Sequence, residues 1–370
     1  MRDKPQEFDG DIPWIRIEDF NGKYISGSKS DQKVSETTVA DMNLKVFPVG
    51  TVLCSCSCSM GATAIVSQPL ISNQTFIGIV PAEDLFSDFL YYLVQAAKPT
   101  LDSLGTGAIQ KYLSRSDFEH FKVAFPSLSE QQAIADFLDR KTAQIDTLIE
   151  KKQRQIDLLQ EQRDVMTQNA MRSSEVKSLK LGDVADWIKR PINRQDEELY
   201  ERIGLYNRGR GIFHKPIAKG VDLGDSDFFE IKDGDFVISG QFAWEGAVAL
   251  ARQEEDGCFA SHRYYSLRGK PGYAETAYLF SFFTTQLGDN LLNHHSRGAA
   301  GRNRPLNINT LLREKIPVPP LSMQIPITDL IEKTVVLKKN TQKLVDFLQE
   351  YRATLISDVV TGKIDVRTAV

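Results

Sequence analysis

Two long stretches of the chain carry apolar residues at helical spacing, with charged residues between them. In the first stretch these apolar positions are Ile134, Leu138, Ile145, Leu148, Ile149, Ile156, Leu159 and Met166. In the second stretch, alternating steps of four and three connect Leu330, Thr334, Leu337, Thr341, Leu344, Leu348, Tyr351 and Leu355. This alternation is typical of a coiled-coil seam. Because a helix of about 40 residues cannot bury such a stripe alone, we expect the two helices to pack antiparallel.

The ends of both helices carry local signals. Ser129, with Gln132 three residues later, has the spacing of a capping box, so we expect Ser129 to be the N-cap of the first helix. Pro326 predicts that the second helix starts a residue or more out of register with the first, because proline fits only the first turn. Gly362 predicts the end of the second helix.

Short apolar runs bounded by Gly, Pro, Asn and Asp precede each long helix and predict strands. These runs are residues 51–58, 75–80, 235–240 and 247–251. Apolar stretches at residues 84–97 and 276–287 predict helices between the strands. We therefore expect two α+β domains, each followed by a long helix.

The chain also repeats itself. Residues 113–134 align with residues 306–327 at an offset of 193, and residues 157–163 align with residues 346–352 at an offset of 189. The difference of four residues is about one helical turn, so one long helix is expected to be a turn longer. The chain is a tandem duplication. We expect a rod of roughly 55–60 Å with one globular domain at each end and pseudo-twofold symmetry.

Composition sets broad limits on the class of protein. The 370 residues are 41% hydrophobic and 25% charged, with a net charge of −4. These fractions are ordinary for globular proteins, and the length allows two or three domains. No apolar run approaches the roughly 18–20 residues that span a bilayer, and the polar N-terminus is unlike a secretory signal. A cytoplasmic protein is expected.

Signals of catalysis or metal binding are weak. The sequence contains no GxxxxGK[ST] phosphate loop and no HExxH, GxSxG or [DN]PP[YF] motif, so no catalytic residue is predicted. Cys54, Cys56 and Cys58 would share one face of a strand, whereas Cys258 stands alone. No CxxC or CxxH pair completes a ligand set, and the five histidines lack ligand spacing. We expect buried thiols and no metal.

The distribution of basic residues points to nucleic acid. Arginines interleaved with glycine occur at residues 294–305 and again at residues 206–215. Arginine forks suit phosphate and can read guanine in the major groove. In the first half, Lys111 aligns with Arg304 at the offset of 193. The predicted DNA-contacting residues are Lys29, Lys33, Lys111, Arg208, Arg210, Arg297, Arg302 and Arg304.

The duplicated motifs have a counterpart among known proteins. A globular domain followed by a proline-ended strand, the pattern P-x-L-x-x-Q and a long helix occurs twice, in residues 125–163 and 318–352. Residues 12–26 and 178–190 look like domain openings. This organisation resembles the specificity (S) subunit of type I restriction–modification enzymes, and the resemblance covers essentially the whole chain.

The resemblance implies two target-recognition domains, residues 1–128 and 175–320, which each read one half of a bipartite, asymmetric DNA sequence. It also implies two spacer helices, residues 129–174 and 321–370, that bind the partner subunits. The expected spacer residues are Leu138, Ile145, Leu159, Leu337, Leu344, Leu348 and Leu355. Aligning Ile17 with Leu205 places the counterpart of residues 181–184 before residue 1, so the first domain is expected to lack its opening segment.

The same resemblance assigns the chemistry to other chains. Modification subunits would methylate adenine with S-adenosylmethionine, and restriction subunits would use ATP and Mg²⁺, whereas this chain would hold no cofactor and catalyse nothing itself. Two alternatives remain open. One is a coiled-coil module that bridges proteins without sequence-specific DNA binding, and the other is a nuclease or metalloenzyme built on the cysteine-rich strand.

Overall fold

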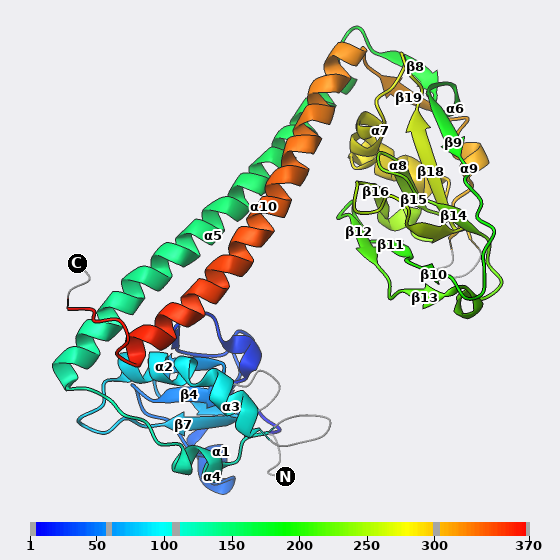
Figure 1. Cartoon of the computed structure of the whole chain (residues 1–370). Coiled ribbons are helices and arrows are strands. Elements are labelled where there is room, and N and C mark those ends of the chain that lie inside the picture. Colours follow the sequence, from blue (N-terminus) through cyan, green and yellow to red (C-terminus); the bar gives the residue numbers. More distant parts are fainter. Residues whose placement is uncertain (1–4, 57–60, 106–111, 299–303, 368–370) are drawn as a thin grey trace. The chain divides into compact units, whose positions relative to one another are not determined.

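The computed structural model describes residues 5–56, 61–105, 112–298 and 304–367. The chain forms two compact units (Figure 1). Unit 1 contains residues 1–151 and 342–370, and unit 2 contains residues 152–341. Each unit has one mixed α+β part and one segment of each long helix, so the predicted fold class is confirmed.

Unit 1 is built on a four-stranded sheet of order β2-β5-β4-β7 and a three-stranded sheet of order β3-β1-β6. Its strands are β1 (Ile12–Ile15), β2 (Tyr24–Ile25), β3 (Lys33–Val34), β4 (Val52–Ser55), β5 (Thr63–Val66), β6 (Ile71–Ser72) and β7 (Phe76–Ile79). Its short helices are η1 (Ile17–Asp19), α1 (Glu36–Asp41), α2 (Ser87–Ala96), α3 (Lys98–Leu104) and α4 (Arg115–His120). The helix predicted at residues 84–97 is α2.

Strand β4 lies between two cores because its side chains alternate between the two faces of the sheet. Val52 and Cys54 face a cluster that includes Phe89 of α2. Leu53 faces the opposite cluster, which includes Ile15 of β1. All five side chains are fully buried. Burial on both faces explains why this strand is a continuous apolar run and not an alternating one.

Unit 2 is built on a four-stranded sheet of order β16-β15-β18-β9. Its other strands form two-stranded sheets that pair β19 with β8, β11 with β12, β14 with β17 and β10 with β13. The strands are β8 (Lys177–Lys180), β9 (Ala185–Ile188), β10 (Leu199–Tyr200), β11 (Ile203–Leu205), β12 (Ile212–His214), β13 (Ala218–Lys219), β14 (Phe228–Glu230), β15 (Phe236–Ser239), β16 (Val248–Leu250), β17 (Phe259–Ser261), β18 (Tyr264–Gly269) and β19 (Lys315–Val318).

The short helices of unit 2 are α6 (Leu181–Val184), η2 (Gly220–Leu223), η3 (Ala243–Glu245), α7 (Thr276–Phe283), α8 (Gln286–His294) and α9 (Ile308–Leu311). The single helix predicted at residues 276–287 is in fact two helices. Thr285 separates them, because its side chain accepts a hydrogen bond from the backbone N–H of Gly288 and caps α8. Phe236 of β15 packs with Tyr278 and Phe282 of α7 in the main core.

The two units repeat the same strand-entry turn. Gly50 and Gly234 precede β4 and β15 with φ of +84° and +81°, a conformation that favours glycine. The Gly50 N–H donates to the Val66 carbonyl at 2.8 Å, and the Gly234 N–H donates to the Ala251 carbonyl at 3.0 Å. The two turns lie in stretches that also resemble each other in sequence: residues 47–53 resemble residues 231–237, and residues 60–66 resemble residues 245–251. The sheets of the two units are therefore equivalent, with β4 matching β15 and β7 matching β18.

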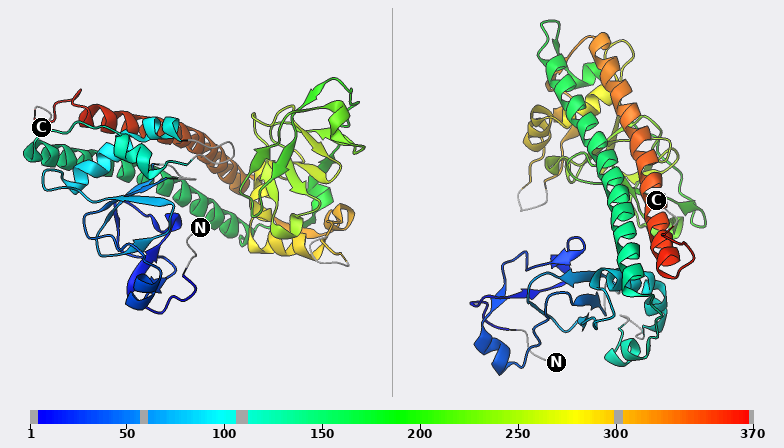
Figure 2. Two further views of the ribbon diagram at one scale, coloured as in Figure 1. Left: turned by 90° about the horizontal axis from the view of Figure 1, so that it is seen from below. Right: turned by 90° about the vertical axis from the view of Figure 1, so that its left-hand side faces the viewer.

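The two long helices are α5 (Leu128–Met171) and α10 (Leu321–Val360). In unit 1, Leu138 near the start of α5 shares a buried cluster with Leu355 near the end of α10. In unit 2, Ala170 at the end of α5 shares a buried cluster with Ile327 and Ile331 near the start of α10. In each unit the two helix segments thus lie side by side and run antiparallel (Figure 2).

Most predicted seam positions are covered. Leu138, Ile145, Leu348 and Leu355 are buried, whereas Leu159, Leu337 and Leu344 are half-buried. Tyr351 was wrong as a seam residue, because it is 46% exposed. Leu148, one of the apolar positions of the first helix, is 39% exposed. A straight helix drifts from a strict seven-residue repeat, so some positions rotate out of the seam. Thr142 takes a buried place in α5 instead, where its hydroxyl donates to the Leu138 carbonyl at 2.8 Å.

Two of the predicted helix ends are wrong and one is confirmed. Helix α5 begins at Leu128, and the Glu130 carboxylate accepts hydrogen bonds from the N–H and hydroxyl of Ser127, so the cap lies two residues before Ser129. Helix α10 begins at Leu321, the counterpart of Leu128, so Pro326 does not displace it. Buried Gln324 and Ile327 on either side of the proline hold this turn in place. Helix α10 ends at Val360, and Gly362 follows with φ of +77°.

In each unit, one buried glutamine joins the β-rich part to a long helix. In unit 1 the Gln131 side chain accepts from the Phe86 N–H and donates to the carbonyls of Asp84 and Pro126. Gln324 occupies the corresponding place in unit 2. Among the described residues, no helix is both long and apolar enough to cross a membrane.

Candidate nucleic-acid interface

A tight turn between β11 and β12 carries two of the predicted arginines. Arg208, Gly209 and Gly211 all have positive φ, at 58°, 62° and 113°. The N–H of Arg208 donates to the Glu245 carbonyl at 3.0 Å, so the turn is fixed to η3. Its backbone is therefore held while the side chains of Arg208 and Arg210 remain exposed.

Aromatic rings support two of the exposed arginines. The Arg210 guanidinium carbon lies 5.6 Å from the centroid of the Tyr206 ring, and that of Arg304 lies 5.0 Å from the centroid of the Trp244 ring. Cation–π contacts of this kind orient a guanidinium without neutralising its charge. Because Trp244 and the Glu245 carbonyl both belong to η3, this short helix positions the arginine turn and Arg304 together.

Arg297 lies on a second feature of unit 2, an open pocket of about 740 Å³. Its guanidinium donates to the His294 carbonyl at 3.2 Å. Trp187 and Tyr265 line the same pocket, with ring centroids 5.4 Å apart in an edge-to-face arrangement. The Lys189 amino group lies 3.8 Å from the centroid of the Trp187 ring. A cationic pocket with aromatic walls suits both phosphate and an unstacked base.

The charges of these arginines are not compensated. Among the described residues, none of Arg208, Arg210, Arg297 and Arg304 forms an ion pair with a carboxylate. Other arginines of unit 2 do so: Arg190 and Arg268 both bind the fully buried carboxylate of Asp235, each with a shortest contact of 2.6 Å. The four exposed arginines therefore leave positive charge at the surface, whereas Arg190 and Arg268 serve the core.

Two of the predicted lysines of unit 1, Lys29 and Lys33, have internal partners. The Lys29 amino group donates to the Glu18 carbonyl, and its N–H donates to the buried Asp19 carboxylate at 2.7 Å. The Lys33 amino group lies 2.9 Å from Asp31, and the hydrogen bond between them raises the pKa of Lys33. Lys111 and Arg302 lie outside the described residues.

The sequence did not single out Trp187, Lys189 and Trp244, although the motif WIK at residues 187–189 places a cation beside an aromatic ring.

The two described thiols of unit 1 are buried in its core. Cys54 and Cys56 are buried in the same cluster, as expected for alternate strand positions, whereas Cys58 lies outside the described residues. Burial raises the pKa of Cys54 to about 12 and that of Cys56 to about 11. Because the thiolate is the metal ligand and the nucleophile, these pKa values favour a structural role over the metalloenzyme alternative.

One cluster could hold a metal ion, and sequence spacing did not reveal it. The ligand atoms of Glu201, His214 and Cys258 lie within 4.8 Å of one another. They come from positions far apart in sequence, brought together beside the pairing of β11 with β12. The His214 Nδ1 lies 2.8 Å from the Glu201 carboxylate. Burial raises the pKa of the Cys258 thiol to about 11, so ligation would require loss of a tightly held proton.

Comparison with known proteins places this geometry in a family. A family model described as the type I restriction modification DNA specificity domain matches residues 1–158 and 173–346. The type I restriction enzyme MjaIX specificity subunit of Methanocaldococcus jannaschii is 34% identical over 154 residues, which are 41% of this chain and 35% of that relative. The EcoR124I/EcoR124II specificity subunit of Escherichia coli is 26% identical over 165 residues, covering 41% of this chain and 39% of that relative. Both matches span well under half the length of these relatives.

A solved structure supports the fold. It is described as the structural basis of complex assembly and conformational transition of the type I R-M system, and it matches with a TM-score of 0.52 and 16% identity over 85% of this chain and 83% of that one. The family model matches this chain twice and covers most of its length, in agreement with the tandem duplication. The chain belongs to the type I restriction–modification DNA specificity family.

Proposed function

We propose that this chain is the DNA-reading subunit of a type I restriction–modification complex. Its two globular parts each read one half of a split, asymmetric target, and partner subunits carry out adenine methylation and DNA cleavage. The chain holds no cofactor itself. S-adenosylmethionine, ATP and Mg²⁺ belong to the modification and restriction subunits.

One observation carries the proposal: a single chain contains two equivalent β-rich parts whose polar surfaces differ. Their sheets share the Gly50 and Gly234 turns, so the two parts are repeats of one architecture. Unit 2 exposes four arginines without carboxylate partners among the described residues, whereas Lys29 and Lys33 of unit 1 have internal partners. Two non-identical reading surfaces in one chain favour a non-palindromic target.

The arginines supply the chemistry of DNA contact. A guanidinium fork binds phosphate oxygens and can pair with the O6 and N7 atoms of guanine. The arginines held by η3 and the pocket beside Arg297 are the proposed reading surface of unit 2. Lys29, Lys33 and Lys111 are the proposed contacts of unit 1. The exposed sides of α5 and α10 are proposed to bind the partner subunits, because the relatives MjaIX and EcoR124I/EcoR124II are specificity subunits of type I restriction enzymes.

The decisive experiment is a methylome. The chain is co-expressed with its modification subunit in a host that lacks DNA methylation, and modified adenines are mapped by single-molecule sequencing. We expect one bipartite, asymmetric motif with a fixed gap. Substitution of Arg297 and Arg304 by Ala should abolish or relax one half of that motif, whereas Lys363→Ala, at an exposed position after the end of α10, should leave it unchanged.

The other outcomes are informative. A motif specified on one side only would contradict the role of two reading domains. A stable complex that methylates no DNA, or methylates it without sequence preference, would favour the protein-bridging alternative and overturn the proposal.

A further inference from the structure

In unit 2, a histidine at the end of β12 lies between two carboxylates and a thiol. The His214 Nδ1 lies 2.8 Å from a carboxylate oxygen of Glu201, and the Cys258 Sγ lies 4.0 Å from the same nitrogen. The His214 Nε2 lies 3.4 Å from a carboxylate oxygen of Glu255. Glu255 and Cys258 are buried, whereas His214 and Glu201 are partly open to solvent. The two ring nitrogens therefore have different surroundings.

The main chain fixes the positions of these residues. The N–H of Phe259, the residue after Cys258, donates to the Glu201 carbonyl at 2.9 Å. His214 pairs in register with Ile203 of β11, two residues after Glu201. The three donor side chains therefore come from paired backbone segments, and their ligand atoms all lie within 4.8 Å of one another.

The charges of this cluster do not balance. Among the described residues, His214 is the only cationic side chain that forms an ion pair with Glu201 or Glu255. The two carboxylates thus share at most one positive charge, beside a thiol that becomes negative when it binds a metal. A divalent cation would supply the missing charge and would ionise the coordinating thiol outright.

The donor types are those of a zinc site. Zn²⁺ is bound in proteins by thiolate, imidazole and carboxylate groups, and a thiolate in the set favours it over Mg²⁺ or Ca²⁺. Because the His214 Nε2 faces Glu255, this nitrogen can keep its proton against a carboxylate while Nδ1 coordinates. A carboxylate behind the ligating histidine is typical of zinc sites, where it orients the ring.

We propose that Glu201, His214 and Cys258 bind one structural Zn²⁺ ion. Water completes the four ligands, and Glu255 acts as the positioning residue of the His214 ring. The ion takes no part in methylation or cleavage, since its role is to hold segments of unit 2 together.

The ion connects the arginine turn to a long helix. Strand β12 is one arm of the hairpin whose turn carries Arg208 and Arg210. Cys258 lies at the end of the connection from β16 to β17, and this connection is fixed to α10 because Glu254 pairs with Lys339 at 2.6 Å. A Zn²⁺ ion on His214 and Cys258 would therefore restrict movement of the hairpin relative to that connection.

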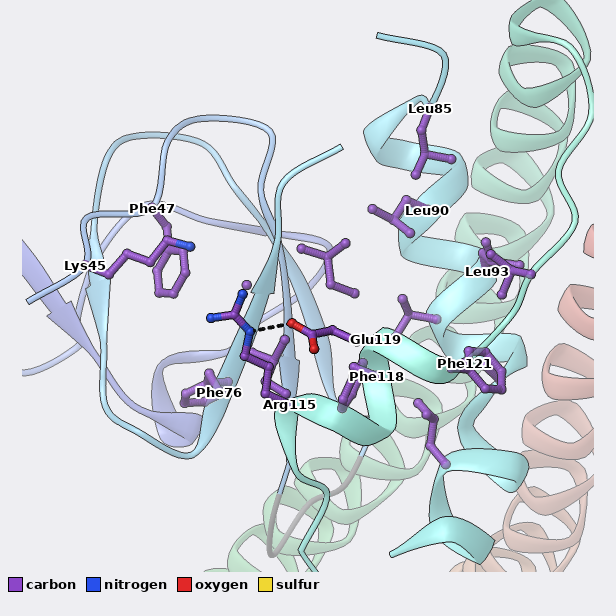
Figure 3. Close-up of a pocket in the computed structure, with 17 residues that line it drawn as sticks. Lys45, Phe47, Phe76, Leu85, Leu90, Leu93, Arg115, Phe118, Glu119 and Phe121 are labelled. Atoms are coloured by element: carbon purple, nitrogen blue, oxygen red, sulfur yellow. Dashed lines mark hydrogen bonds and ion pairs between the residues drawn. The ribbon is translucent and has the colours of Figure 1, made fainter. Parts of the chain in front are cut away.

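The cavity of unit 1 has a different chemistry (Figure 3). It has a volume of about 460 Å³ and lies between β7 and helices α2 and α4. Its lining is mainly apolar, and Arg115 and Glu119 neutralise each other there in an ion pair of 2.8 Å. The described lining residues include no histidine and no cysteine. Within the part of the chain that the structure describes, the zinc-type donor set thus occurs in unit 2 alone.

The test uses the full chain without an affinity tag, stripped of metal and titrated with Zn²⁺ against a chromophoric chelator. We expect one Zn²⁺ per chain. Co²⁺ in place of Zn²⁺ should give a thiolate-to-metal charge-transfer band in the near ultraviolet. Hydrogen exchange should show that Zn²⁺ increases protection in residues 200–215 and 254–259, without change in unit 1.

Matched variants identify the ligands. Glu255→Gln, which changes the group behind the ring, should weaken Zn²⁺ binding about tenfold and keep the Co²⁺ band. Cys258→Ser and His214→Asn should weaken binding further, and Cys258→Ser should also remove the band. Cys54→Ala, at a buried thiol of unit 1, and His262→Asn, at an exposed histidine of unit 2, should bind Zn²⁺ as the unsubstituted chain does.

The melting temperatures of the metal-free proteins separate loss of a ligand from loss of the fold. Cys258→Ser should melt with the unsubstituted chain when both lack metal, and Zn²⁺ should then raise the melting temperature of the unsubstituted chain only. Binding of less than one Zn²⁺, a Co²⁺ complex without the thiolate band, or equal affinity in Cys258→Ser would each overturn the proposal. The cluster would then be a protonated imidazole held between two carboxylates. The methylome is a separate readout, so these outcomes leave the proposed DNA reading untouched.

Discussion

Gln131 and Gln324, which stand 193 positions apart, make the same three hydrogen bonds in the two units. Each Oε1 accepts from the N–H of the residue before a helix, Phe86 before α2 and Glu275 before α7. Each Nε2 donates to two carbonyls. One belongs to the residue two positions before that N–H, Asp84 in unit 1 and Tyr273 in unit 2. The other belongs to the proline five positions before the glutamine. Both side chains are fully buried. The glutamine of the P-x-L-x-x-Q pattern therefore fixes a β-rich part to a long helix.

Removing either glutamine should destabilise its own unit. Gln131→Ala or Gln324→Ala leaves one N–H and two carbonyls without their partner, and a buried polar group left unpaired costs about 1–3 kcal/mol. Urea denaturation of the full chain should show this loss. Gln132→Ala is the control because the Gln132 side chain is exposed. Equal losses for Gln131→Ala and Gln132→Ala would contradict the role of the buried glutamine.

The exposed arginines should determine the salt dependence of DNA binding. Removing one arginine that touches a phosphate reduces the slope of log affinity against log salt concentration by about one. Arg297→Ala combined with Arg304→Ala should reduce the slope by about two, measured on a specific duplex with the assembled complex. Lys363→Ala should not change the slope, because Lys363 lies after the end of α10 and is paired with Asp358. If affinity and slope both stay the same in the double variant, these two arginines do not touch DNA.

The buried carboxylate of Asp235 should be essential to unit 2. It accepts hydrogen bonds from Arg190, Arg268 and the Lys232 N–H. Asp235→Ala removes the carboxylate partner of two guanidinium groups. Because both groups are partly exposed to water, the cost should lie below the value of about 3–5 kcal/mol for an ion pair with both partners buried. Calorimetry of the full chain should show the lowered stability. The exposed Asp233→Ala is the control, and a comparable loss there would show that the charge network is not responsible.

The described thiols should resist alkylation in the folded protein. Burial raises the pKa of Cys54 to about 12 and those of Cys56 and Cys258 to about 11. At pH 8, therefore, about one in a thousand of these thiols or fewer is ionised to the reactive thiolate. Iodoacetamide labelling read by peptide mass spectrometry should be at least about a hundredfold slower at these residues than in denaturant. Rapid labelling of Cys54 in the folded chain would show that the strand opens.

Local periodicity explains what the sequence could predict. The seam of α10 follows from Leu330 to Leu355 because a four–three repeat fixes one face of a helix, and the duplication follows from direct comparison of the two halves. The cap of α5 was displaced by two residues because Ser127 and Ser129 are both followed three residues later by a side chain that can complete a capping box. Sequence spacing alone could not choose between them.

Tertiary contacts explain what the sequence could not predict. Arg190 and Arg208 are chemically identical, yet Arg190 binds Asp235, 45 positions away, whereas Arg208 is exposed. Likewise, Glu201, His214 and Cys258 show no ligand spacing in the sequence because their proximity depends on how the surrounding strands pair. The charge that remains available at a surface is known only when the internal partners of the other charged groups are known.

The partners of Gln131 and Gln324 have a consequence for how such chains can evolve. On the β-rich side of each junction the hydrogen bonds of the glutamine go to main-chain groups, so they require no particular side chain there. A recombination event that replaced one β-rich part with another of the same backbone would keep all three hydrogen bonds. The junction is thus compatible with exchange of whole cassettes, in which a new surface is acquired while the helical scaffold is inherited unchanged.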